Sequence, residues 1–181
     1  MKLVVAVTGA SGAIYAKRLI ERLEGMGLAF ATVFTKNAID VWQHELEEKP
    51  PLDTLLVYDE KDFNAPFASG SSDYQALVVC PCSMGTLGRI AHGISDSLIT
   101  RAADVMLKER RKLILVPREM PYNLIHIENM RVLTMAGATI IPASPSFYSK
   151  PQSINALADT VIDKVLTGLG LDFERYKWGD S

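Results

Sequence analysis

Two charged residues, Arg118 and Glu119, follow directly on a short apolar run and lie between Pro117 and Pro121. The run Leu113–Val116 is too short for a helix and suits a strand that is covered on both faces of a parallel sheet. Ligands of such sheets bind at the carboxyl ends of the strands, where this pair falls. A guanidinium there can bind an anion, and a carboxylate can transfer a proton. For the dipeptide alone, a surface ion pair in a loop is the alternative.

Glycines and hydroxyl side chains dominate the segments that follow the other expected strands, which are Thr8–Gly12, Thr35–Asn37, Pro81–Thr86 and Pro142–Tyr148. Glycines, hydroxyls and the free N–H groups of helix starts are the chemistry of a phosphate cradle. One Ser or Thr before a helix is more often only its cap. Four hydroxyls that meet at one sheet edge are a stronger indication, because together they could donate to a phosphate or a flavin ring: Ser11, Thr35, Ser83 and Thr86.

The first glycine-rich loop bears on which nucleotide would bind. It reads Gly9-x-x-Gly12, with Tyr15 where the dinucleotide fingerprint has a third glycine, and the second strand ends at Thr35 and Lys36 without an acid for a ribose hydroxyl. NAD is therefore disfavoured. NADP stays open because Lys36 could bind a 2′-phosphate, but a mononucleotide such as FMN, with one phosphate and a planar ring, fits the hydroxyl-rich edge better.

Alternating strands and helices must position these side chains. Strands are expected over residues 2–7, 29–34, 76–80, 112–116 and 139–141, and helices over residues 13–26, 37–48, 84–92, 96–110, 125–136 and 153–169, with Asn37 as a helix cap and one more short strand near residues 55–58. This alternation predicts an α/β fold with a doubly wound, mostly parallel sheet, a Rossmann-like or flavodoxin-like three-layer sandwich. Residues 1–170 are expected to form one domain. Residues 171–181, with Tyr176 and Trp178, are expected to form a tail that docks on a neighbouring subunit.

The composition excludes several classes of protein. The chain has 181 residues, a net charge of -2, and 48% hydrophobic and 22% charged residues, so neither nucleic acid nor a membrane is an expected partner. The basic cluster Lys108–Lys112 is interpreted as a helix end. No signal peptide and no apolar stretch of about 18 residues is found, so a cytoplasmic location is expected. Cys80 and Cys82 flank Pro81 and are predicted to be buried, reduced thiols rather than a disulfide or a zinc site.

Several motifs lie in order along nearly the whole chain: Thr8–Gly12, Ala68–Ser72, Cys80–Thr86, Arg101–Arg111, Val116–Pro121, Ile125–Met130 and Phe147–Tyr148. Together they resemble the UbiX-like flavin prenyltransferases, a family named for ubiquinone biosynthesis. The family joins the dimethylallyl group of dimethylallyl monophosphate to reduced FMN, and the product, prenylated FMN, is the cofactor of UbiD-like decarboxylases. Its members assemble as dodecamers of trimers, so the resemblance implies a homo-oligomer.

The resemblance also implies roles for individual residues. Those implied to contact FMN are Gly9, Ala10, Ser11, Thr35, Ser83, Met84, Gly85, Thr86, Arg101 and Arg118. Those implied to hold the prenyl phosphate are Lys108, Arg118, Tyr148 and Lys164, of which a neighbouring subunit could supply Tyr148 and Lys164. Many family members have arginine where this chain has Lys164, and a lysine keeps the charge but loses the two-donor fork. Glu45 is expected to face the same site.

The proposed chemistry can be argued from the residues as well. A departing phosphate needs cations and hydrogen-bond donors, which this set provides, so no metal is expected, and the chain lacks an Asp-rich diphosphate motif. Bonding at the flavin N5 and C6 releases protons. Glu119 is the first candidate to take them, because a carboxylate at the end of a buried strand is costly to keep unless it is used, and Ser11 is the candidate for a relay. The histidines His44, His92 and His126 are alternative bases. We interpret His126 as structural, because the flanking isoleucines place it in an apolar helix start.

Two other functions stay open at this point. One is an FMN-dependent decarboxylase of the cysteine-oxidising type, although its Pro-Ala-Met-Asn stretch is replaced here by Pro117–Pro121. The other is a non-catalytic flavin carrier, which would need neither Glu119 nor a second group of phosphate-binding cations. The sequence does not distinguish dimethylallyl monophosphate from the pyrophosphate as donor.

Overall fold

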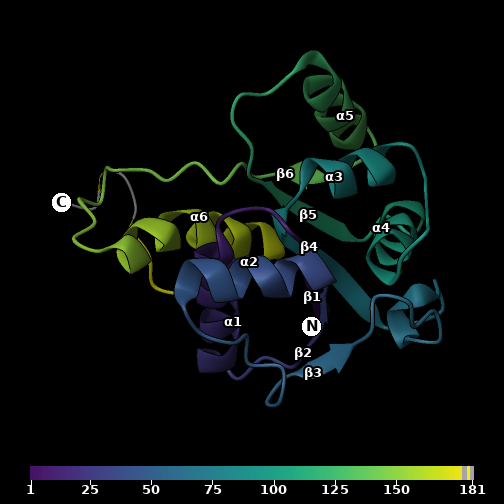
Figure 1. The fold of residues 1–181 in the computed structure, drawn as a ribbon, viewed down its shortest axis with the longest axis horizontal. Coiled ribbons are helices and arrows are strands. Elements are labelled where there is room, and N and C mark those ends of the chain that lie inside the picture. The colour runs from purple at the N-terminus through teal and green to yellow at the C-terminus, as the bar shows by residue number, and fades with distance from the viewer. Residues whose placement is uncertain (177–178, 180–181) are drawn as a thin grey trace.

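A computed structural model describes residues 1–176 and 179. Six parallel strands form one sheet in the order β3-β2-β1-β4-β5-β6 (Figure 1). They are β1 (Lys2–Val7), β2 (Phe30–Phe34), β3 (Leu56–Tyr58), β4 (Tyr74–Cys82), β5 (Lys112–Pro117) and β6 (Thr139–Ile140). Because the order reverses between β1 and β4, the sheet has a topological switch point at its centre, the place where ligands of doubly wound folds bind. The predicted fold class is confirmed.

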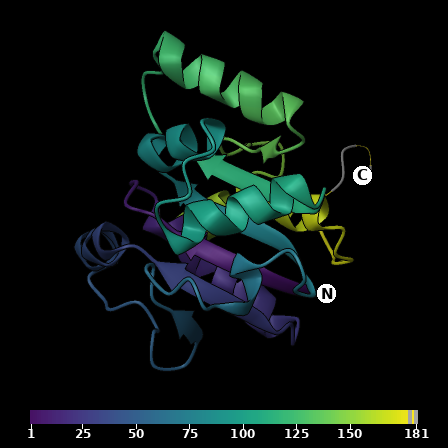
Figure 2. The ribbon, with the colours of Figure 1, turned by 90° about the vertical axis from the view of Figure 1, so that its right-hand side faces the viewer.

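Helices cover both faces of the sheet (Figures 1 and 2). On one face lie α1 (Ala13–Gly25), α2 (Lys36–Leu46) and α6 (Ile154–Leu169). On the other face lie α3 (Met84–Ala91), α4 (Leu98–Lys108) and the short helix η1 (Pro66–Ala68), with α5 (Leu124–Met135) packed against α3. The molecule is therefore a three-layer sandwich.

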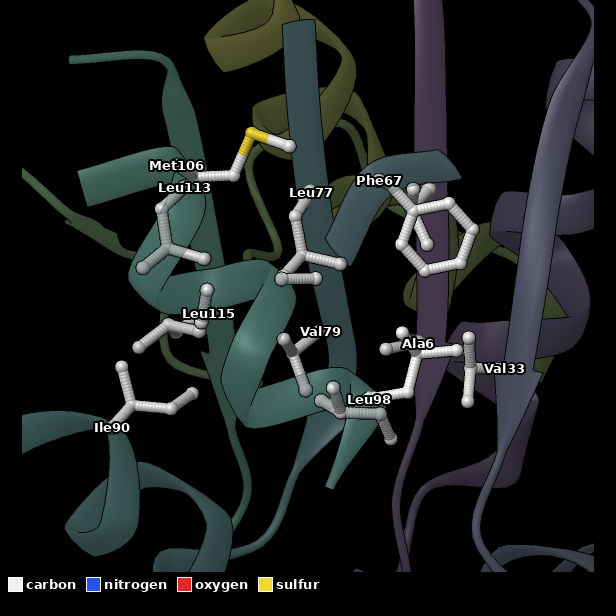
Figure 3. Packing of buried hydrophobic residues seen from close by; sticks show 14 of the residues in the cluster. Ala6, Val33, Phe67, Leu77, Val79, Ile90, Leu98, Met106, Leu113 and Leu115 are labelled. Carbon is white, nitrogen blue, oxygen red and sulfur yellow. The ribbon is translucent and has the colours of Figure 1, made fainter. Parts of the chain in front are cut away.

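Side-chain alternation along the strands divides the core between the two faces. Ala6, Leu77 and Leu115 point toward α4 and pack around its Leu98 and Met106, as Figure 3 shows. The intervening strand residues form the second cluster with α1 and α6. Both sets are almost fully excluded from solvent, which explains why the strands read as continuous apolar runs rather than alternating ones.

Some element boundaries differ from the expectation. The short strand expected near residues 55–58 is confirmed as β3, a sixth strand. Asn37 does not cap α2. Thr35 does, with its hydroxyl oxygen accepting from the Ala38 N–H at 3.1 Å, so the helix begins at Lys36. The expected helix from residue 96 begins at Leu98, because Ser97 and Thr100 form a capping box.

The C-terminal segment leaves α6 at Gly170, whose φ of 78° lies in the left-handed region. The described part of this segment continues without a helix or strand to Tyr176, and Trp178 lies outside the described residues. Within the described chain, every helix is too short or too polar to cross a bilayer.

Candidate active site

Thr8 ties together the two loops on either side of the switch point. It follows β1 and is almost completely buried. Its hydroxyl donates to the carbonyl oxygen of Pro81 at 2.9 Å and accepts from the Ser83 N–H at 2.8 Å. The loops that follow β1 and β4 are therefore held in one fixed arrangement at the carboxyl edge of the sheet.

Gly9 allows the first loop to approach the start of α2. A Cβ atom built on Gly9 would lie 2.5 Å from the Asn37 Cβ, closer than two carbon atoms can approach without a shift. Gly12, at the end of the same loop, has a φ of 105°, which favours glycine. The two glycines therefore let the backbone follow a path that side chains would block.

A pocket of about 290 Å³ lies at this edge of the sheet. Of the residues predicted to contact FMN, it is lined by Gly9, Thr35, Ser83 and Thr86. The N-termini of α2, α3 and α4 reach the pocket through their capping residues Thr35, Ser83 and Ser97. Helix N-termini carry partial positive charge and unpaired N–H groups, so this arrangement suits an anion such as phosphate.

The pocket also has lining residues that the sequence reasoning missed. They are Glu60, Lys61, Arg89, Asp96, Ser97, Ile99 and Thr100, whereas Thr8, Lys36 and Asn37, which also line the pocket, belong to the loops predicted at this edge. Arg89 forms a salt bridge with Asp96, with 3.2 Å between Nε and Oδ2. The sequence does indicate part of this set, because Ser97 and Thr100 are three residues apart, the spacing of a capping box at a helix start.

Glu45 closes the N-terminus of α1. One carboxylate oxygen accepts from the N–H groups of Gly12 and Ala13, both at 2.8 Å. The Ser11 hydroxyl also donates to this carboxylate, while the Nε of Arg118 donates to the Ser11 carbonyl oxygen at 3.1 Å. The structure thus brings together three residues that were predicted for the site, Ser11, Glu45 and Arg118. The helix N-terminus expected to be open for phosphate in the first loop is instead occupied by a side chain.

The Glu45 carboxyl has a pKa below its usual value. Partial burial acts to raise this pKa, but hydrogen bonds from Ser11, Ala13 and Gly12, with the charge of Arg118, lower it further than burial raises it. A carboxyl whose pKa is lowered on folding stabilises the fold at pH values above its unfolded pKa. That stabilisation is lost as the pH falls through the folded value.

Glu45→Gln is therefore expected to lower the free energy of unfolding at pH 7 by about 0.5–1 kcal/mol, a range for a charge at an exposed helix N-terminus that allows for solvent screening. The difference from wild type should shrink as the pH falls below about 4. Denaturant titrations between pH 3 and pH 7 measure it, with Glu24→Gln as the matched control on the exposed side of α1. A difference that is equal at every pH would show that Glu45 acts without its charge.

Glu119 is exposed in the single chain, although a carboxylate at the end of a buried strand was expected. β5 is buried through Pro117, but Arg118 is only half-buried and Glu119 is exposed in the chain. The Glu119 Oε1 accepts from the N–H of Met120 at 3.0 Å, whereas Arg118 turns toward Ser11. The premise that burial constrains this carboxylate is wrong for the single chain, because the strand ends two residues earlier.

The two predicted residues of α4 are not part of the pocket lining. Arg101 is half-buried, and its guanidinium donates to the Ala68 carbonyl oxygen at 3.0 Å and to the Asp104 carboxylate at 2.8 Å. Lys108 pairs with Glu109 at the other end of the helix. That end lies beside the start of β4, since Arg111 donates to the Tyr74 carbonyl oxygen at 2.9 Å. In one chain, Lys108 is therefore at the opposite edge of the sheet from the pocket.

Tyr148 and Lys164 line a second pocket, of about 680 Å³, along the outer side of α6. The chain after β6 runs beside this helix (Figure 1), where the Ser146 N–H donates to the Thr160 hydroxyl at 3.0 Å. The residues that line this pocket are Ser146, Tyr148, Ser149, Thr160, Asp163, Lys164, Thr167, Arg175 and Tyr176, and they share none with the first pocket.

The remaining titratable candidates have structural surroundings. His126 and Asn123 form the capping box of α5, but the helix start is exposed, with Ile125 at 68%, so the expected apolar surroundings are absent from the single chain. Cys80 and Cys82 are buried free thiols, as predicted. Burial raises the pKa of both, that of Cys82 to about 12, so neither is a thiolate at neutral pH.

Comparisons with known proteins agree on one family. A family model described as Flavoprotein matches residues 1–166. A flavin prenyltransferase UbiX of Methanocaldococcus jannaschii is 46% identical, over 99% of both chains. A crystal structure of AnUbiX in complex with FMN and dimethylallyl pyrophosphate superposes with a TM-score of 0.92 and 41% identity, covering 97% of each chain. A dodecameric FMN-dependent UbiX-like decarboxylase from Escherichia coli superposes with a TM-score of 0.92 and 38% identity, covering 98% of this chain and 99% of that one.

Proposed function

The chain belongs to the Flavoprotein family, as one of its UbiX-like flavin prenyltransferases, and from this premise we propose that it joins the dimethylallyl group of dimethylallyl monophosphate to N5 and C6 of reduced FMN. The observation that carries the proposal is the pocket at the switch point. It combines three helix N-termini with the hydroxyls of Thr35, Ser83 and Thr86, and the backbone at Gly9 passes where a side chain would not fit. Such a pocket suits a flavin mononucleotide phosphate and ring edge.

The residues proposed for the FMN side come from four loops at this edge. Gly9, Ala10 and Ser11 follow β1, Thr35 follows β2, and Ser83 to Thr86 open α3. Arg118 follows β5 and reaches the carbonyl oxygen of Ser11. Two observations support an FMN role for these residues, their common place at the carboxyl edge of the sheet and the family motif. For Arg101, only the motif supports this role.

The chain's cations and carboxylates suit the two demands of the reaction. Breaking the C1–O bond of the donor leaves negative charge on phosphate, which Lys108, Arg118, Tyr148 and Lys164 are proposed to stabilise. Bond formation at N5 releases one proton. Ring closure at C6 requires protonation of the alkene and loss of a second proton. We assign these proton transfers to Glu119, with Ser11 and Glu45 as the other candidates.

Assembly of several copies would bring these residues together. Lys108, Tyr148 and Lys164 lie away from the first pocket in one chain, so we propose that neighbouring subunits supply them, in a dodecamer like that of the Escherichia coli relative. Exposed apolar side chains support an interface, because Leu124 and Met135 on α5 are 71% and 76% exposed and Phe147 is 71% exposed.

The cysteine-type decarboxylase is disfavoured by the thiols. Such an enzyme needs a reactive cysteine at the flavin, whereas Cys80 and Cys82 are buried and have raised pKa values. A non-catalytic carrier would not require the cations of the second pocket. These observations favour the transferase.

Thr35→Val is expected to weaken FMN binding by about 10-fold, the effect of losing one hydrogen bond to a charged group. It should also cost about 1 kcal/mol of stability, because it removes the α2 cap. Ser153→Ala is the matched control, since Ser153 caps α6 by accepting from the Ala156 N–H at 3.1 Å and lines neither pocket. Flavin fluorescence titration separates the two effects. Equal FMN affinities for both variants would contradict the role of Thr35.

The proposed function is tested by incubating the protein anaerobically with reduced FMN and dimethylallyl monophosphate. A flavin mass increased by one prenyl group supports the transferase, and unchanged flavin would overturn it. The same reaction in EDTA should proceed at the same rate, because phosphate is stabilised by side chains. Loss of activity that magnesium restores would contradict metal independence.

We further propose that a UbiD-like decarboxylase receives the product and that the protein is cytoplasmic, since its proposed substrates are charged phosphates that do not cross a membrane unaided. Reconstitution of an apo-decarboxylase of that class with the reaction product tests the first point.

A further inference from the structure

The second pocket contains a cation with no assigned role, Arg175. It belongs to the segment after α6 and lines the pocket together with Tyr148 and Lys164. The family motifs quoted above do not include it. Its position beside two residues proposed for phosphate binding raises the question of what its guanidinium does there.

The guanidinium of Arg175 is held in place from one side. Its Nη1 donates to the hydroxyl oxygen of Thr167, and that hydroxyl donates to the Asp163 carbonyl oxygen at 2.6 Å. Its central carbon lies 5.4 Å from the ring centroid of Phe173, within cation–π distance. These contacts use one N–H group of the fork, so the remaining donors are available for a ligand.

The acidic residues near this pocket form ion pairs with another helix. The Asp163 Oδ1 lies 3.2 Å from the Arg22 Nη1 in a salt bridge. The geometry at this oxygen does not meet the criteria of a hydrogen bond. Asp159, one turn earlier on α6, pairs with Arg18 at 2.8 Å. Both arginines come from α1. Burial still raises the pKa of Asp163, while the charges of Arg22 and, more weakly, of Arg175 act to lower it.

The cations of the pocket are not compensated in the same way. In the described part of the chain, Lys164 makes no hydrogen bond or salt bridge, and Arg175 makes no salt bridge. With Asp163 paired to Arg22, Lys164 and Arg175 leave the pocket with excess positive charge, surrounded by hydroxyls. This is the chemistry of a phosphate site.

We propose that Arg175 binds the phosphate of the prenyl donor together with Lys164, an inference that rests on the proposed function. Lys164 is a point charge without a planar pair of donors. Arg175 supplies that pair from a different segment. It is therefore a substrate-binding residue that compensates for the lysine.

The test measures donor and flavin binding separately in the full-length oligomer. Arg175→Lys and Arg175→Gln are compared with Arg131→Lys, an exposed arginine on α5 that pairs with Glu128 and lines neither pocket. Calorimetry with dimethylallyl monophosphate gives the donor affinity without turnover, and flavin titration gives the FMN affinity. Steady-state kinetics then separate KM from kcat.

Arg175→Gln is expected to weaken donor binding and raise its KM by about 10-fold or more, with kcat and FMN affinity unchanged, as for loss of a charged hydrogen bond. Arg175→Lys should show a smaller loss, and Lys164→Arg in the Arg175→Gln background should recover most of it. Unchanged donor affinity in Arg175→Gln would overturn the inference, as would a loss of FMN affinity instead. Because donor binding is measured directly, failure of the wild type to prenylate FMN would reject the proposed function, while the donor affinity of Arg175→Gln would still decide the role of Arg175.

Discussion

Gly9→Ala is expected to weaken FMN binding by about 10- to 100-fold while the protein stays folded. The added Cβ would lie 2.5 Å from the Asn37 Cβ and 3.3 Å from the Asn37 carbonyl carbon. Neither is the flexible end of a side chain, so the first loop and the start of α2 must move apart. A forced shift of this kind costs about 1–3 kcal/mol, and here the shift widens the pocket between Thr8 and Thr35.

Gly25→Ala is the matched control for this substitution. Gly25 lies in the last turn of α1, and a Cβ built on it meets nothing within 4 Å. Alanine there should leave FMN binding unchanged and favour the helix by about 0.5–1 kcal/mol. Flavin titration and thermal unfolding of both variants measure the two quantities. Wild-type FMN affinity in Gly9→Ala would show that the flavin does not depend on this close approach.

The sheet and its carboxyl edge could be predicted because both leave local signals in the sequence. Continuous apolar runs indicate strands covered on two faces, and the hydroxyls of Thr35 and Ser83 are helix caps that also face the pocket. The alternation of strands and helices then brings the loops after the strands to one edge. These inferences need only neighbouring residues.

The parts that could not be predicted depend on contacts between distant residues. Glu45 closes a helix that begins 32 residues earlier, and no local pattern indicates that pairing. Lys108 ends a helix that runs antiparallel to the strands, which carries it away from the edge where α4 begins. Arg175 meets Thr167 and Phe173 only because the chain turns back at Gly170.

The exposure of Glu119 changes the physical reason for expecting it to be catalytic. In the chain alone, solvent reaches the carboxylate, so burial does not constrain it. What remains is its position one residue after Arg118, at the carboxyl edge shared by the proposed FMN residues, and the need of the reaction for a proton acceptor. A subunit placed over this edge would desolvate the carboxylate, which is the condition under which such groups become effective bases.

Glu119→Gln is expected to retain the fold and FMN affinity and to lower turnover by about 10²-fold or more, the usual contribution of general acid–base catalysis. Glutamine has the same shape and keeps an acceptor for the Met120 N–H, but it does not transfer protons at neutral pH. Ring closure at C6 requires more proton transfers than bonding at N5. An N5-alkylated flavin should therefore accumulate.

The reaction is monitored by absorbance rather than by mass. The N5-alkylated flavin and the ring-closed product have the same mass, but their chromophores differ. Time-resolved spectra of Glu119→Gln and of Glu24→Gln, an exposed control on α1, separate a slow ring closure from a general loss of activity. Slow closure in Glu119→Gln alone would support its role in proton transfer. Ring-closed product formed at the wild-type rate would show that Glu119 does not transfer the proton, and that role would then fall to Ser11, Glu45 or the released phosphate.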